Sequence, residues 1–370
     1  MRAVLLRFVM EPFWEWKTDE GIPFIGFGFM LIPWVIIAAI SLWLTFKSQR
    51  ATGNATSTDS ESGTTKQDMI ASLVTFIGVP LAAWLFLPKP LRTDGVPIFG
   101  YGFMMFVGIA SATFLAVRNA KMLGLKSEVI MDMLMWLVIP GIVGGRLFYV
   151  VQKHFELGFL KGMSIPEALF AIVNLPNGGL VFFGAIIGGL GGFLAYCYRR
   201  NLDILLMGDI VLPSVFIGLA FGRIGCFLYG CCYGGPCALP WAVEFPAKSV
   251  PWDAQVSRGF IAEDALTSLP LHPTQIYSSV NAFLLATVLV LYLRHRPYNG
   301  SALAIGWIMY PIARFIIEIL RNDEMGLFGT KFTISQQISI GLFVTGIIFT
   351  ALLVKTRGKL FRGSPAAVAT

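Results

Sequence analysis

The chain has 370 residues, of which 56% are hydrophobic and only 13% are charged, and its mean hydropathy is +0.72. Soluble globular proteins carry about 25% charged residues. This composition excludes a free cytoplasmic enzyme, a secreted disulfide scaffold and a nucleic-acid-binding protein, although the net charge is +7. An excess of Lys and Arg in a membrane protein usually lies in the loops and sets its orientation. The sequence therefore predicts a multi-pass membrane protein.

Apolar segments long enough for the ~20 residues that cross a bilayer recur along the chain. Their continuous apolar character favours helices, because barrel strands would alternate over about ten residues. Residues Met1–Arg7 are broken by charge and are expected to form an interfacial segment. We predict an all-α fold of about nine transmembrane helices, at 22–46, 69–88, 97–117, 129–151, 179–198, 203–229, 274–293, 300–321 and 333–354.

Lys and Arg are densest in the loops after the first, third, fifth and seventh segments and in the C-terminal tail. The positive-inside rule places these regions in the cytoplasm. The N-terminus and the long 230–273 loop are then expected outside.

A stretch rich in Ser, Thr, Gly and Asn, Lys47–Asp68, is expected to be a flexible cytoplasmic loop. It indicates an N-terminal extension over 1–92 with two helices, a membrane core over 93–360 and a disordered tail over 361–370. Gly21–Leu31 recurs in similar form as Gly95–Met105. The first helices are therefore a partial duplication of the opening of the core, or the similarity is chance.

Small residues crowd the segment at 179–198. Such residues let helix backbones approach closely, so they predict a packing seam. Close packing could also leave a groove for a lipid chain. The glycines are Gly184, Gly188, Gly189, Gly191 and Gly192.

Arg146, Arg223, Arg314 and Arg321 lie within or at the ends of apolar segments, at similar depth in the outer leaflet. An arginine at membrane depth costs about 2.5 kcal/mol or more and by default marks a functional site. Glu318 is one turn from Arg314, so a local ion pair is plausible. At least two charges then need an anionic ligand, and phosphate suits the planar guanidinium. Snorkelling to lipid headgroups is the alternative for Arg321 and Arg146.

Other polar residues are expected at the same level. Tyr310, Arg314 and Arg321 share one predicted helix face. Tyr101 lies in the outer part of its segment, and His272 and Gln275 begin the seventh segment. His272-Pro273 could also simply start a helix, since Pro is favoured in the first turn.

These residues carry a resemblance to a known family. The run Gly222–Gly234 resembles the signature of bacterial prolipoprotein diacylglyceryl transferases. Further matching pieces follow the order of that family, and the resemblance covers about 95–354. They are Tyr101-Gly102, Gly144–Leu147, Gly178–Gly184, Trp241–Pro246, His272–Tyr277 and Tyr310 through Arg314 to Glu318.

The resemblance implies an enzyme of the bacterial inner membrane with seven core helices, its N-terminus outside and its C-terminus inside. It would transfer the diacylglyceryl group of phosphatidylglycerol to the lipobox cysteine of a prolipoprotein at the outer leaflet, without cofactor or metal. Membrane lipids and the prolipoprotein signal peptide are the expected partners. The implied catalytic residues are Arg223, Arg314, His272 and Tyr101; the implied lipid-binding residues are Arg223, Arg314, Arg146, Tyr310, Gln275 and Gly234.

Several positions depart from the pattern of the family. Phe183 replaces a histidine, Cys226 an asparagine, and Cys231 and Ser278 replace glutamates. The usual candidate base is therefore missing. Either His272 or Glu244 takes the proton, or the substrate thiol needs no strong base, or this branch has another activity. We favour His272.

Four cysteines, Cys226, Cys231, Cys232 and Cys237, lie close together on the expected outer side. On the oxidising side a disulfide is the natural expectation. Small-residue packing and a metal or redox thiol site are the alternatives, although the spacing is not a standard zinc pattern.

Two rival functions remain. A divergent family member would have a thiol-redox role or another acceptor. A lipid transporter or scramblase would also use intramembrane arginines, but here the polar residues gather at one leaflet.

Overall fold

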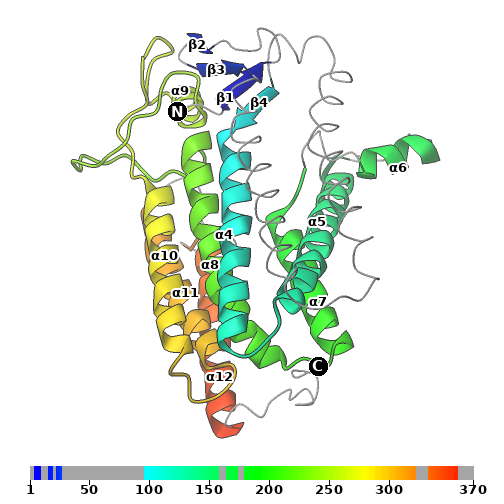
Figure 1. Cartoon of the computed structure of the whole chain (residues 1–370). Coiled ribbons are helices and arrows are strands. Elements are labelled where there is room, and N and C mark those ends of the chain that lie inside the picture. The colour runs from blue at the N-terminus through cyan, green and yellow to red at the C-terminus, as the bar shows by residue number, and fades with distance from the viewer. Residues whose placement is uncertain are drawn as a thin grey trace, which may run out of the picture. The chain divides into compact units, whose positions relative to one another are not determined.

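The computed structural model describes residues 4–9, 16–19, 22–26, 96–157, 164–173, 179–321 and 332–356. By contact density the chain divides into two compact units, Arg2–Phe103 and Met104–Thr370 with Met1. Each unit is described by itself (Figure 1).

Seven helices among the described residues are long and apolar enough to cross a membrane. This confirms the prediction of a polytopic helical membrane protein, with helix ends within a few residues of those expected. The seven are α4 (Gly100–Met122), α5 (Ser127–Leu157), α7 (Phe182–Arg199), α8 (Ile204–Tyr229), α10 (Thr274–Leu293), α11 (Ser301–Ile319) and α12 (Ile334–Thr356). Two shorter helices are α6 (Ile165–Val173) and α9 (Val250–Ser257).

The smaller unit contains a four-stranded sheet. Its strands are β1 (Val4–Val9), β2 (Trp16–Asp19), β3 (Ile22–Gly26) and β4 (Val96–Phe99), in the order β2-β3-β1-β4. β1 runs parallel to β3 and antiparallel to β4, and Arg7 pairs with both Phe24 and Pro97. β2 pairs antiparallel with β3.

The sheet corrects one prediction, because residues 22–26 form a strand where the first helix was expected to begin. Residues 4–9 also form a strand, and their expected interfacial location stays a prediction. Pro23 and Gly26 disfavour the interior of a helix, whereas Pro at the start of a strand is tolerated. The remainder of the helix predicted at 22–46, the helix predicted at 69–88, the loop Lys47–Asp68 and the tail 361–370 lie outside the described residues.

The two similar segments of the sequence both begin as strands at matching positions, β3 and β4, and they flank β1. The division between the units falls at Phe103 because β4 pairs with β1. This pairing joins residues far apart in the sequence, and the expected domain boundary at 92 stays a prediction.

Within the larger unit, α5 packs most extensively against α7, α8 against α10, and α11 against α12 (Figure 1). The contact of α5 with α7 depends on glycine. A methyl group at Gly188 or Gly192 would collide with the carbonyl oxygen of Pro140 or Trp136, respectively. The predicted packing seam is confirmed.

Two aspartates fix the starts of α8 and α11. Asp203 caps α8 by accepting hydrogen bonds from the backbone N–H groups of Leu205 and Leu206. Asp209 is fully buried and accepts hydrogen bonds from the N–H groups of Gly300 and Leu303, both at 2.8 Å. These bonds tie the start of α11 to α8.

Candidate active site

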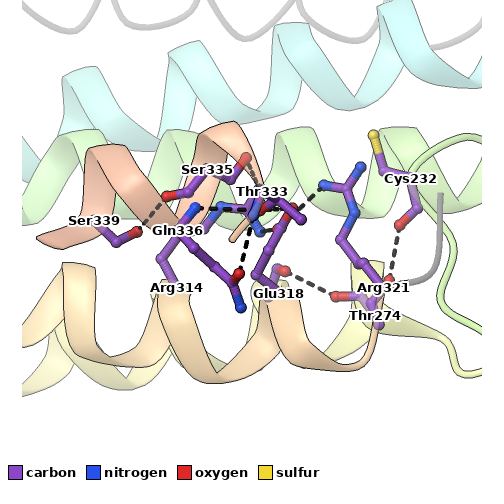
Figure 2. Close-up of polar contacts among 10 residues, drawn as sticks. Cys232, Thr274, Arg314, Glu318, Arg321, Thr333, Ser335, Gln336 and Ser339 are labelled. Carbon is purple, nitrogen blue, oxygen red and sulfur yellow. Dashed lines mark hydrogen bonds and ion pairs between the residues drawn. The ribbon is translucent and has the colours of Figure 1, made fainter. Parts of the chain in front are cut away.

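A buried ionic cluster lies where α11 ends and α12 begins (Figure 2). Glu318 has no exposed side-chain surface, and its Oε2 forms an ion pair with Nη1 of Arg314. Nη1 of Arg321 lies 3.8 Å from the same oxygen. The predicted local ion pair is confirmed. One carboxylate therefore serves two guanidinium groups.

Residues of α12 and of the turn before it complete this cluster. The Thr333 hydroxyl donates a hydrogen bond to Oε1 of Glu318 at 3.2 Å, and Nη2 of Arg314 donates to Oγ of Ser335 at 3.0 Å. Sequence reasoning missed both hydroxyl residues. Both residues stand at the start of an apolar segment, directly after the segment that carries Arg314. This position is the sequence feature that could have identified them.

The loop after α8 packs against the same region. α8 ends at Gly230, whose φ of +89° reverses the chain. The amide of Gln275 donates to the carbonyl of Cys231, and the hydroxyl of Thr274 donates to the carbonyl of Cys232, both at 2.8 Å. The N–H of Gly235 donates to the carbonyl of Leu320 at 2.9 Å. The loop therefore joins the start of α10 to the end of α11.

Gly234 serves this close packing. A methyl group there would lie 2.6 Å from Cβ of His272 and 2.8 Å from the carbonyl oxygen of Leu320. The N–H of Gly234 donates to the carbonyl of His272 at 2.9 Å. These contacts of Gly234 pack the loop against α10 and the end of α11. Its implied role in lipid binding stays a prediction.

Arg223 differs from the other three arginines. It is half-buried near the end of α8, and it makes no hydrogen bond or ion pair with the described residues. Its charge acts, together with that of Arg321, on the Cys232 thiol in the loop after α8. Arg223 therefore has no anionic partner among the described residues, which agrees with the expectation that some of these arginines lack one.

Arg146 is occupied by the backbone. Its guanidinium donates to the carbonyl oxygens of Ala171 at 2.6 Å, Ile172 at 2.8 Å and Gly179 at 3.0 Å, and it lies over the ring of Tyr149. Only 8% of the residue is exposed. These carbonyls, two of them in the last turn of α6, explain how the charge is stabilised at this depth. The implied role of Arg146 in lipid binding stays a prediction.

His272 lies at the start of α10 in a chain of polar contacts. The indole N–H of Trp241 donates to the hydroxyl of Tyr277 at 2.8 Å, and Nδ1 of His272 lies 3.4 Å from the same hydroxyl. One imidazole nitrogen of His272 is thereby engaged. The alternative base, Glu244, is exposed and accepts a hydrogen bond from the Thr267 hydroxyl at 3.1 Å.

Three other predicted residues lie in different surroundings. The ring of Tyr310 packs against Phe216 with 5.7 Å between centroids, in an apolar cluster. Tyr101 lies in the first turn of α4 with 43% of its surface exposed, and it belongs to the smaller unit. Gln275 is fully buried, and its Oε1 has no hydrogen-bond partner among the described residues. Their roles in the reaction stay predictions.

The cysteines are all free, so the expected disulfide is not present. The sulfur atoms of Cys226, Cys231 and Cys232 lie within 4.8 Å of one another, and Cys237 is outside this group. Hydrogen bonds from the Cys226 and Cys231 thiols, and then the charges of Arg223 and Arg321, lower the pKa of the Cys232 thiol. Hydrogen bonding to Cys226 and Cys232 raises the pKa of Cys231.

An apolar cleft of about 270 Å³ opens between α4, α5 and α8. The Ser214 hydroxyl in its wall is buried without a hydrogen-bond partner. The size and lining suit part of an acyl chain. The lining residues include Ile109, Ala112, Met133, Leu137, Val215 and Gly218.

Comparison with known proteins identifies a family that matches most of the chain. The family model for prolipoprotein diacylglyceryl transferase matches residues 88–352. The chain belongs to this family. Its relatives include a phosphatidylglycerol–prolipoprotein diacylglyceryl transferase from Clostridium tetani, 38% identical over 265 residues, which covers 70% of this chain and 97% of the relative.

Two further transferases extend the comparison. One from Clostridium perfringens, designated transferase 2, is 34% identical and covers 69% of this chain and 90% of the relative. One from Rhodopirellula baltica is 27% identical and covers 91% of this chain and 87% of the relative. The last alignment reaches into the N-terminal extension, so this region has a counterpart in at least one transferase of the family.

Positions that differ from the transferase pattern have local roles in this chain. The ring of Phe183 packs edge-on against Phe182 at the start of α7. The Ser278 hydroxyl donates to the carbonyl of Thr274, one turn earlier in α10. Neither residue supplies a proton acceptor for the reaction.

Proposed function

We propose that this chain transfers the sn-1,2-diacylglyceryl group of phosphatidylglycerol to the lipobox cysteine thiol of a prolipoprotein. The sulfur forms a bond to the glycerol carbon, and the bond from this carbon to the phosphate oxygen breaks. The thiol proton passes to a base, and glycerol phosphate leaves. Negative charge grows on the phosphate as the bond breaks, so the reaction needs fixed cations at that point.

Arg223 is the observation that carries this proposal. It is half-buried near the end of an apolar helix and has no anion among the described residues. A guanidinium there is costly unless an anion binds it, and a phosphodiester supplies oxygens in the geometry that arginine prefers.

Arg314 has a different role from Arg223 in this proposal. Because Glu318 and Ser335 already hold its guanidinium, Arg314 is oriented before the lipid arrives. Its remaining N–H groups then face the phosphate without a loss of side-chain freedom on binding. This preorganisation favours the transition state over free lipid.

His272 accepts the thiol proton in this proposal. When Nδ1–H donates to the Tyr277 hydroxyl, Nε2 is the free acceptor. The phenol oxygen can accept from both His272 and Trp241. Trp241 and Tyr277 then select the tautomer of His272 that acts as a base.

The acyl chains extend from the headgroup site into the bilayer, and one chain occupies the apolar cleft between α4, α5 and α8. The headgroup site faces the outer leaflet of the inner membrane in this proposal, which the density of Lys and Arg in the loops supports. The N-terminus is then outside and the C-terminus in the cytoplasm. A translocated prolipoprotein reaches the site from this side.

The test is lipid transfer by purified full-length protein from phosphatidylglycerol vesicles to a prolipoprotein. Arg223→Ala is expected to lower the rate by about 100-fold or more, as expected for loss of one charge-stabilising donor. Its thermal stability should change little, because Arg223 has no partner among the described residues. Arg200→Ala is the matched control, since Arg200 pairs with Asp132 at an exposed site. A normal rate for Arg223→Ala contradicts the proposed phosphate site.

A further inference from the structure

The three thiols of Cys226, Cys231 and Cys232 form a compact group that the transfer reaction does not use. We propose that they bind a thiophilic metal ion, zinc or copper(I), through three thiolates. An ion bound by sulfur at about 2.3 Å holds its ligand sulfurs about 4 Å apart. The three sulfurs already lie within 4.8 Å of one another. Small side-chain rotations bring them to this spacing.

The backbone is folded to bring these sulfurs together. The N–H groups of Gly230 and Cys231 both donate to the carbonyl of Cys226, at 2.9 and 3.1 Å. The chain therefore turns back on the last turn of α8. Cys232 has a φ of +61°, which side-chain-bearing residues rarely adopt. Such strained positions persist where the surroundings hold them, and they cluster at functional sites.

Residues of α10 hold the strained segment. The hydrogen bonds from Gln275 and Thr274 to the carbonyls of Cys231 and Cys232 fix both peptide groups. Oε1 of Gln275 is buried and has no hydrogen-bond partner. It supplies an acceptor beside the cluster for a water molecule on the ion. Three protein ligands and a water complete the fourfold coordination typical of zinc.

A disulfide is the rival state of this cluster. It would join two of the sulfurs and leave the third unused, whereas an ion uses all three. In the structure all three are thiols. Oxygen-ligated cations such as Mg²⁺ do not suit this donor set, because soft sulfur ligands select zinc and copper(I).

The test uses the full chain purified in detergent without oxygen, stripped by a chelator and titrated with zinc or, separately, with copper(I). We expect one ion per chain, and protection of three thiols from alkylation, counted by mass spectrometry. Cys226→Ser, Cys231→Ser and Cys232→Ser should each weaken binding at least about tenfold. Cys237→Ser and Cys197→Ser are matched controls and should bind as the unaltered chain does, since neither belongs to the cluster.

Cobalt(II) provides a second measurement on the unaltered chain, because thiolate coordination produces a charge-transfer absorption band. Substoichiometric zinc and copper(I) binding, equal loss in the control variants, or a disulfide within the cluster in freshly isolated protein would each overturn the proposal. These measurements do not use lipid transfer, so their failure leaves the proposed function untouched.

Discussion

Intramembrane arginines that look alike in the sequence have different partners in the structure. Arg314 and Arg321 share the carboxylate of Glu318. Arg146 donates to three backbone carbonyls, and Arg223 has no partner among the described residues. A guanidinium with its donors already used holds the fold together, whereas one without partners is available to a ligand. This difference supports the proposal that Arg223 binds phosphate, and it predicts that Arg146 contributes to stability.

Replacing Arg146 with Ala is expected to lower stability by about 2 kcal/mol or more, because three carbonyl oxygens lose a charged donor. Thermal unfolding of the purified variant in detergent measures this loss. Arg200→Ala is again the control, since Arg200 is exposed. If the Arg146→Ala variant kept its stability but lost lipid transfer, the prediction would be contradicted, and a role of Arg146 in lipid binding would be supported instead.

Replacing His272 with Ala is expected to lower the rate of lipid transfer at least about tenfold at neutral pH, the low end for loss of a general base. Tyr277→Phe should lower the rate less, because it removes only the group that orients His272. His295→Ala is the control, since His295 is exposed and contacts the carbonyl of Leu291. An unchanged rate in His272→Ala removes this residue from the reaction.

At the scale of elements, the seam between α5 and α7 depends on glycines that touch backbone. Gly188 and Gly192 approach carbonyl oxygens of Pro140 and Trp136. Gly191 lies on the same helix but has open space beside it. The position of a glycine relative to the neighbouring helix therefore decides how much stability is lost when it is replaced.

Gly188→Ala is expected to destabilise the protein by about 1–3 kcal/mol, because the added methyl group forces the two helices apart. Gly191→Ala should leave stability unchanged or slightly raised, since alanine favours the helix. Thermal unfolding of both variants, measured side by side, checks the expectation. Equal stability of the two would mean that the helices do not pack as described.

At the scale of the whole molecule, helices far apart in the sequence form one cleft. Ala112 of α4, Met133 of α5 and Gly218 of α8 all line it. A methyl group at Gly218 would meet only Cβ of Ala112, at 3.9 Å. A larger side chain there would extend into the cleft.

Gly218→Leu is expected to lower transfer from long-chain phosphatidylglycerol more than from a short-chain form, because leucine fills the space for the acyl chain. The rates with the two lipids, compared in one assay, measure this selectivity. Gly341→Leu is the control, since Gly341 on α12 is exposed with open space around it. Equal losses with both lipids would show that the cleft does not hold the chain.

Much of this protein follows from the sequence alone. Seven helices of the core were predicted from continuous apolar length, because crossing a bilayer requires about twenty apolar residues in one stretch. The ion pair of Arg314 with Glu318 was predicted because residues four apart on a helix are neighbours. Both are local properties of the chain.

Only the tertiary structure decided the rest. The carbonyls around Arg146, the strand pairing of β1 with β4 and the cleft at Gly218 join residues far apart in the sequence. The cysteines were expected to pair, but the turn at Gly230 and the bonds from α10 instead bring three thiols together. Local patterns report periodicity and spacing. They do not show which distant groups come into contact. Those contacts distinguish Arg146, which donates to three backbone carbonyls, from Arg223, which has no partner among the described residues.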